Sequence, residues 1–424
     1  MYQLDLMARI RSRQRASEHA GTADSDTGLN VSPTVWKLGF TSLFTDISSE
    51  MVGSILPVYF VLYLHFSTVE FGFLDGISQG AAVALLSLFA GAFADRWRRQ
   101  KEVATAGYAL SAISRVGLLA AGKLWLLIAV VLALDRVGKG IRTAPRDAMI
   151  SLSSAQQRLA TSFAVHRALD TCGAVCGPLM AFLLMRLVPD AFNIVLMMSV
   201  CIALIGLGVI VLLVDKPASL IDSSRSQATL RTCAGLLKHR DFRVLAVAGG
   251  VLGMATISDG FVYLLLQKKT HSPVTSIPLY TFLTAIFYLV LSVPAGRMAD
   301  RWGRTRVFLL GYGLLASVYT ISLLPEVGGR GALAAVALLG AYYAATDGVL
   351  AAMTSATLEK HLRTTGLAML NTASSLSRLV SSVLFGWLWS WCTVRNAVGL
   401  FLVGLTAAMI LSAVMIPARR RPLA

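Results

Sequence analysis

Apolar runs of about twenty residues recur from Trp36 almost to the C-terminal end of the chain, and short polar segments separate them. As a helix, each run is long enough to cross a hydrocarbon core of about 30 Å. The pattern therefore predicts an all-α membrane protein with twelve transmembrane helices. The expected helices cover residues 36–64, 71–93, 103–121, 123–145, 157–186, 190–214, 242–267, 275–297, 305–324, 330–352, 364–390 and 395–416.

A hydrophilic connector near the middle of the chain divides these helices into two sets of six. The predicted organisation is a cytoplasmic basic tail (1–34), an N-terminal six-helix bundle (35–214), a cytoplasmic connector (215–241), a C-terminal six-helix bundle (242–416) and a short cytoplasmic tail (417–424). The apolar runs leave no room for a separate soluble domain.

The composition agrees with this class of protein. Of the 424 residues, 56% are hydrophobic and 14% are charged, whereas an average soluble domain is roughly 25% charged. A chain with so little polar surface is expected to lie in a bilayer.

The net charge of +16 follows membrane topology and does not indicate nucleic-acid binding. Most Lys and Arg residues fall in the segments on one side of the predicted membrane, which the positive-inside rule assigns to the cytoplasm. Both termini are then cytoplasmic, and a bacterial inner membrane is the expected location. The five Cys residues have no partner at a zinc-site spacing, so we expect no metal, disulfide or cofactor.

The two halves share a repeated segment. Gly91-Ala-Phe-Ala-Asp95-Arg96-Trp-Arg-Arg99 recurs as Gly296-Arg-Met-Ala-Asp300-Arg301-Trp-Gly-Arg304, and each copy follows an apolar run. Paired halves can rock about a central site and expose it to each side of the membrane in turn. The repeat therefore favours a transporter, although duplication could also have served only to build a large bundle.

The repeated segment resembles the cytoplasmic loop signature of the major facilitator superfamily, with one copy between helices 2 and 3 and a second between helices 8 and 9. The first copy departs from the signature by having Arg98 where Gly is usual. In that family the loop is conformational: Asp95 and Asp300 would meet a helix N-terminus or an Arg and latch one state of the transport cycle. A plain turn-and-anchor role is the alternative.

The run from Phe44 to Glu50, together with the segment from Asp135 to Asp147, resembles an uncharacterised bacterial branch of the family. Two further segments are similar to motifs of the drug/proton antiporter type. Leu132-x-x-x-Arg136-x-x-Lys139-Gly140 resembles the helix 4 motif, and Gly173-x-x-x-Gly177-Pro178 resembles the helix 5 motif, which packs helices closely. This resemblance implies proton-coupled export of a small organic solute or drug. An ion-coupled importer of a small metabolite or siderophore is the alternative, as is a passive facilitator or sensor.

Ionisable residues inside the expected spans are the candidates for proton coupling or for the substrate cavity, because charge at the bilayer centre is costly and such residues are commonly functional. They are Asp46, Glu50, Arg115, Asp135, Arg136, Lys139, His166, Asp170, Asp259, Asp347 and Arg378.

Helical spacing suggests roles for some of these candidates. Asp46 and Glu50 share one face and could hold a proton or a cation, or could pair with basic side chains. Asp135 and Lys139 could neutralise each other, and Arg136 would take part in coupling according to the family resemblance. His166 lies four residues from Asp170, so the pair could relay protons or form a plain hydrogen bond between helices.

No metalloprotease, hydrolase or nucleotide-binding motif is present, so enzymatic activity is not expected. The expected partners are a small-molecule substrate, protons and the lipid bilayer, and the protein is expected to act as a monomer. The predicted mechanism is alternating access around a cavity lined by helices 1, 4, 7 and 10.

Overall fold

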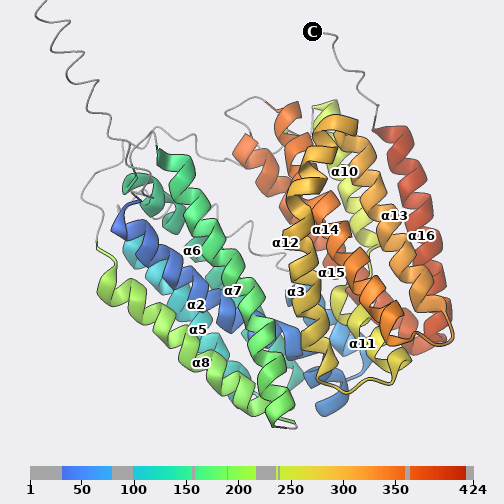
Figure 1. Cartoon of the computed structure of the whole chain (residues 1–424), viewed down its shortest axis with the longest axis horizontal. Helices are drawn as coiled ribbons and strands as arrows, with labels where there is room; N and C mark the ends of the chain where they lie inside the picture. The colour runs from blue at the N-terminus through green and yellow to red at the C-terminus, as the bar shows by residue number, and fades with distance from the viewer. Residues whose placement is uncertain are drawn as a thin grey trace, which may run out of the picture.

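A computed structural model describes residues 31–78, 99–154, 158–188, 190–215, 235–236, 239–358 and 363–416. These ranges are almost entirely helical (Figure 1). The elements before the connector are α2 (Pro33–Val58), the π-helical turn η1 (Tyr59–Tyr63), α3 (Thr68–Ser78), α5 (Gln100–Ala120), α6 (Trp125–Leu152), α7 (Leu159–Leu187), α8 (Phe192–Gly208) and the π-helical turn η3 (Val209–Leu213). The elements after it are α10 (Arg240–Met254), α11 (Asp259–Thr270), α12 (Ser276–Trp302), α13 (Arg304–Leu323), α14 (Gly329–Thr357), α15 (Arg363–Trp391) and α16 (Val394–Met415).

The helices pack mainly within two groups that follow the chain order (Figure 1). In the first group α2 packs on α7 and α8, and α5 packs on α6 and α8. In the second group α14 packs on α12 and α13, while α10 and α13 both contact α16. Helix α3 joins the groups because it packs on both α6 and α15.

Eight helical segments in the described part of the chain are long and apolar enough to cross a membrane. Helices α2 and α6 are comparable in length, with 26 and 28 residues, but they carry charged residues in their middle turns. At about 1.5 Å per residue, 28 helical residues span about 42 Å. The structure therefore supports a multi-pass membrane protein, while the arrangement of twelve spans in two bundles of six stays a prediction.

The span expected over 242–267 is present as Arg240–Thr270, but the structure breaks its helix between α10 and α11. The residues at the break include β-branched Thr256 and Ile257, which are weak helix formers. Tyr319 accepts a hydrogen bond from the Ile257 backbone N–H at 2.6 Å, and Ser381 donates to the Thr256 carbonyl at 2.6 Å. Side chains of α13 and α15 thus replace the missing helical bonds, as membrane depth requires.

One glycine makes the turn between α12 and α13. Gly303 has φ +102°, a region that residues with a Cβ rarely adopt. It belongs to the second copy of the repeated loop segment. The equivalent residue of the first copy, Arg98, lies outside the described residues, as do Gly91, Asp95 and Arg96.

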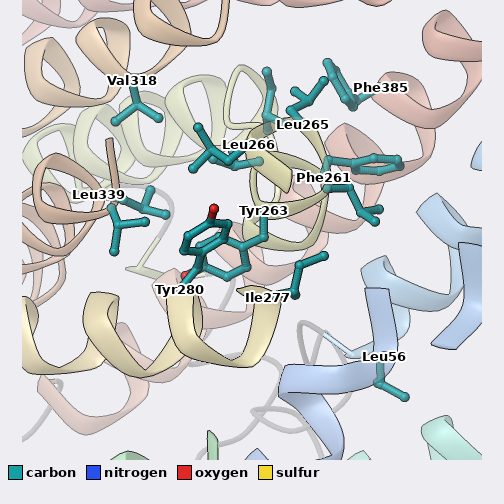
Figure 2. Close-up of a cluster of buried hydrophobic side chains, with 14 of the residues drawn as sticks. Leu56, Phe261, Tyr263, Leu265, Leu266, Ile277, Tyr280, Val318, Leu339 and Phe385 are labelled. Atoms are coloured by element: carbon teal, nitrogen blue, oxygen red, sulfur yellow. The ribbon is translucent and has the colours of Figure 1, made fainter. Parts of the chain in front are cut away.

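One set of contacts between the groups lies toward the end of α15 and the start of α3, and a second joins α12 to α7. Thr68 donates a hydrogen bond to the Gly386 carbonyl at 2.9 Å, and the rings of Phe71 and Phe261 meet edge to face with centroids 4.7 Å apart. Figure 2 shows Phe261 and Phe385 within a cluster of buried apolar side chains. That apolar core runs without interruption from one group into the other.

Candidate functional site

Charged side chains converge at the middle of the first helix group, where α2, α5, α6 and α7 meet. Four of the predicted candidates, Asp46, Glu50, Asp135 and Asp170, are carboxylates within these helices. These four carboxylates lie beside different side chains, so their environments differ although the sequence suggested the same role for all of them.

Asp135 of α6 is held by two guanidinium groups. Its carboxylate oxygens lie 2.9 Å from Arg115 of α5 and 2.8 Å from Arg136 on its own helix. The Arg115 and Asp135 side chains are each 3% exposed, and Arg115 also donates to the Ser49 hydroxyl at 2.7 Å. The expected mutual neutralisation of Asp135 and Lys139 is therefore corrected, since the counter-ion of Asp135 comes mainly from another helix.

A second pair of carboxyl groups joins α2 to α7. The side chains of Asp46 and Asp170 lie within hydrogen-bonding reach of each other, and each has one guanidinium at the outer limit of an ion pair. Arg142 lies 3.8 Å from Asp46, and Arg146 lies 3.8 Å from Asp170. Two carboxyl groups can be hydrogen-bonded only when one of them carries a proton.

His166 takes a different partner from the one that helical spacing suggested. Its Nε2 atom lies 3.1 Å from the Ser42 hydroxyl, which also lies 3.2 Å from the Tyr108 hydroxyl and accepts from Arg146 at 3.3 Å. Through Ser42, His166 is connected to Arg146, which contacts Asp170. The structure therefore places His166 beside the carboxyl pair without a direct bond between His166 and Asp170.

Glu50 and Lys139 are both half-buried near this cluster. Neither side chain has a hydrogen bond or an ion pair within the described part of the chain, although Lys139 is the strongest charged neighbour of Glu50. Both side chains can contact a solute without breaking an existing bond.

Two glycines allow α7 to approach α2 closely. A Cβ added at Gly173 would lie 2.6 Å from the Leu43 carbonyl oxygen, and one at Gly177 would lie 2.7 Å from the Ile47 carbonyl oxygen. Pro178 follows inside the same helix. This close approach brings Asp170 within reach of Asp46.

In the second helix group, the candidates gather beside the break between α10 and α11. Asp259 is the first residue of α11 and accepts a hydrogen bond from Tyr343 of α14 at 2.7 Å. Arg378 of α15 lies 3.7 Å from Asp347 of α14, and its guanidinium stands 5.9 Å from the centroid of the Tyr343 ring. Asp259, Asp347 and Arg378 thus form one local network through Tyr343.

The described copy of the loop segment forms contacts at the end of α12. Arg304 donates to Asp300 at 3.3 Å and to the Ala352 carbonyl of α14 at 3.2 Å. Gly296 and Arg301 lie in the last turns of α12, and Arg99 of the first copy precedes α5. An Arg that joins α12, α13 and α14 fits either the latch or the anchor role.

The sequence reasoning missed Asp75 of α3, which accepts a hydrogen bond from Ser382 of α15 at 2.7 Å. Its carboxylate lies at the junction of the two groups, beside Gly260. A charged residue within an apolar run was the signal used for the other candidates, and it was available for Asp75 as well. Among the described residues, no group of three or more His, Cys, Asp or Glu could hold a metal ion.

Comparison with known proteins places this arrangement in a family. A family model described as Major Facilitator Superfamily matches residues 38–280 and 245–424. The chain belongs to the Major Facilitator Superfamily. An uncharacterised MFS-type transporter of Methanocaldococcus jannaschii is 28% identical over 382 residues, covering 89% of this chain and 93% of that protein. An uncharacterised protein of Mycobacterium tuberculosis is 40% identical over 108 residues, covering 26% of each chain.

Solved structures of other transporters have the same fold. The nucleoside transporter NupG matches with a TM-score of 0.76 at 15% identity, covering 91% of this chain and 98% of that one. A bacterial homolog of the human lysosomal transporter Spinster, in an inward-facing and unoccupied conformation, matches with a TM-score of 0.69 at 14% identity, covering 92% of this chain and 98% of that one. A mutant of a peptide transporter POT in complex with alafosfalin matches with a TM-score of 0.73 at 15% identity, covering 91% of this chain and 94% of that one.

Membership of the Major Facilitator Superfamily makes this chain a membrane transporter of a small molecule and not an enzyme. The fold neighbours carry different substrates according to their names, and at these identities they support the fold alone. The substrate, the direction of transport and the coupling ion must therefore be argued from the residues of this chain.

Proposed function

We propose that this transporter is a secondary active, proton-coupled exporter of a small organic solute or drug that works by alternating access. The observation that carries the proposal is the carboxyl pair of Asp46 and Asp170, which lie within hydrogen-bonding reach of each other between α2 and α7. A proton bound there is held by two helices at once, so its release changes the force between them.

The contacts of the pair suggest how the proton acts. Arg142 and Arg146 stand 3.8 Å from Asp46 and Asp170, so a proton shared by the two carboxyl groups leaves both guanidinium groups at the outer limit of an ion pair. Loss of the proton leaves two carboxylates that repel each other and attract these guanidinium groups more strongly. Tighter ion pairs and a wider separation of α2 from α7 would then bias the protein toward one conformation.

Asp135 has a different role in this mechanism. Two guanidinium groups hold it in a nearly fully buried site, so we assign it to the fixed frame of α5 and α6. Glu50 and Lys139, which have no hydrogen-bonding partner among the described residues, are the groups that we place closest to the solute in the first half. Asp259, Asp347 and Arg378 face it from the second half.

The sidedness of the described state follows if both termini are cytoplasmic. The junction contacts at Thr68, Phe71 and Asp75 would then close the outer side, and the state would be inward-facing. An antiporter in this state releases its proton to the cytoplasm and accepts the solute. We further propose a bacterial inner membrane as the location and a monomer as the functional unit.

Import is the second candidate direction. The helix 5 motif of the antiporter type continues with a Gly pair, and this chain has Ala181 and Phe182 there. Because alternating access serves both directions, the sign of the coupling must be measured.

The test compares cells with and without the protein in a screen of labelled lipophilic cations, siderophores and amphipathic antibiotics. For a proton-driven exporter, accumulation of one solute falls, and a protonophore restores it. Asp46→Asn and Asp170→Asn should each abolish this effect, whereas Asp190→Asn, in an exposed turn before α8, should retain it. Export that stays protonophore-sensitive in both variants would exclude the carboxyl pair as the coupling site, and raised accumulation would assign import.

A further inference from the structure

Arg167 is a cation of the first helix group that has no partner among the described residues. The Arg167 side chain on α7 is exposed, and no hydrogen bond or ion pair to its guanidinium is found within the described ranges. The nearby Arg142 and Arg146 differ because both contact carboxylates. Charged groups inside transmembrane segments face the bundle interior or a water-filled space, so Arg167 presents a surplus positive charge to the space between the helix groups.

The network of Asp259, Asp347 and Arg378 in the second helix group has one more negative than positive charge. Arg378 lies 3.7 Å from Asp347 and is also the nearby positive charge for Asp259. One guanidinium therefore serves two carboxylates. The Asp347 side chain is 47% exposed, so its carboxylate stays accessible beside Arg378.

Tyr288 lies on α12, the helix that packs between those of Arg167 and Asp347. It is 37% exposed, and its helix contacts both α7, which carries Arg167, and α14, which carries Asp347. Helix α12 packs against α7 although the two belong to different groups (Figure 1). Arg167 and Asp347 therefore face one common region across the junction. The other unbonded groups, Glu50 and Lys139, are opposite charges that offset each other.

We infer that the solute is a zwitterion, with its anionic group at Arg167 and its cationic group at Asp347, and with Tyr288 and Tyr343 beside the part between them. A singly charged cation would leave the positive charge of Arg167 without a counter-charge, and a singly charged anion would leave the excess negative charge of Asp347 and Asp259 without one. Such unfavourable charge pairs are how a binding site rejects the wrong ligand. This inference names the class of solute for the proposed function, and it rests on that function only because it assumes that the solute is a small organic molecule.

The test is a binding measurement on the purified full-length protein in detergent without a proton gradient. The probes are three scaffolds, phenylalanine, alanyl-phenylalanine and ciprofloxacin, each as the zwitterion, the cationic methyl ester and the anionic N-acetyl form, with uridine as a neutral compound. A ligand that binds the folded state raises the melting temperature. At least one zwitterion should do so, and its ester and N-acetyl form should bind on the order of tenfold more weakly, since each loses a charge-assisted contact.

Charge-specific variants then locate the two ends of the ligand. Arg167→Gln should weaken the zwitterion on the order of tenfold and leave the methyl ester unchanged, because the ester has no carboxylate to lose. Asp347→Asn should weaken the zwitterion and leave the N-acetyl form unchanged. Arg186→Gln, at the far end of α7, and Asp190→Asn are the matched controls and should bind as the wild type does.

Equal or tighter binding of the ester, the N-acetyl form or uridine would overturn the inference, and so would a panel in which no zwitterion stabilises the protein. Equal losses for all three charge forms in Arg167→Gln would assign Arg167 to structure and also overturn it. Because the assay needs no proton gradient, a failure of proton coupling would leave its result untouched. The two proposals can therefore fail separately.

Discussion

Asp135→Asn is expected to damage the folded state of the transporter in addition to any effect on transport. The variant removes one negative charge from between two guanidinium groups, at 2.9 Å from Arg115 and 2.8 Å from Arg136. Arg136 is 21% exposed and can reach water, whereas Arg115 is 3% exposed and cannot. The variant therefore leaves a buried, uncompensated positive charge on α5.

The magnitude follows from that burial. Removing one partner of a buried ion pair costs about 3–5 kcal/mol, because the other charge stays desolvated without its partner. The Ser49 hydroxyl, 2.7 Å from Arg115, offsets part of this cost and places the expected loss near the lower end, at about 3 kcal/mol. Arg115→Met combined with Asp135→Leu removes both charges and should recover most of the loss, because an apolar replacement of a buried pair is often neutral.

The assay is reversible unfolding of the purified protein in mixed detergent micelles, with tryptophan fluorescence as the signal. Asp147→Asn is the matched control, because Asp147 pairs with Arg146 at 3.0 Å but its side chain is 41% exposed, which predicts a change of about 0–1 kcal/mol. A free energy of unfolding for Asp135→Asn within about 1 kcal/mol of the wild type would refute the assignment of Asp135 to the buried frame.

Three further outcomes are expected. Gly177→Ala should lower the melting temperature by an amount equivalent to about 1–3 kcal/mol, because the added Cβ would lie 2.7 Å from a carbonyl oxygen. In the control Gly208→Ala the added Cβ has no neighbour within 4 Å among the described residues, so this variant should be neutral or slightly stabilising. Ser382→Ala should weaken the junction with Asp75 and raise thiol labelling of cysteines engineered at the Thr68 end of α3. Unchanged labelling would contradict that role. The Lys37 ammonium depresses the pKa of Asp215, so this ion pair stabilises the folded protein at pH values above the unfolded carboxyl pKa of about 3.9. The stabilisation is lost as the pH falls through the lower folded pKa, and there the melting temperatures of the wild type and Asp215→Asn should converge.

The sequence predicted the helical segments well because each apolar run reports its own length and ends. The loop segment, the glycines of α7 and most intramembrane charges could likewise be found by composition and spacing. The break in the seventh expected helix was not predicted, because it depends on Tyr319 and Ser381, whose hydroxyl groups come from distant helices.

The partners of the charged residues were harder to predict for the same reason. Spacing along one helix identifies neighbours three or four residues apart, and it suggested Lys139 for Asp135 and Asp170 for His166. The structure instead gives Asp135 the guanidinium of Arg115 and gives His166 the Ser42 hydroxyl. Contacts between helices decide these pairs, and a single sequence does not contain that information.

The central claim is that Asp46 and Asp170 share a proton, and infrared spectroscopy of the purified protein tests it without a known substrate. The carbonyl stretch of a protonated carboxylic acid should be present at mildly acidic pH and should disappear as the pH is raised. We expect this band to be lost in both Asp46→Asn and Asp170→Asn, because each variant leaves only one carboxyl group where two would share the proton, and we expect Asp147→Asn to retain it. A wild-type spectrum without the band, or a band that survives in both variants, would contradict the account.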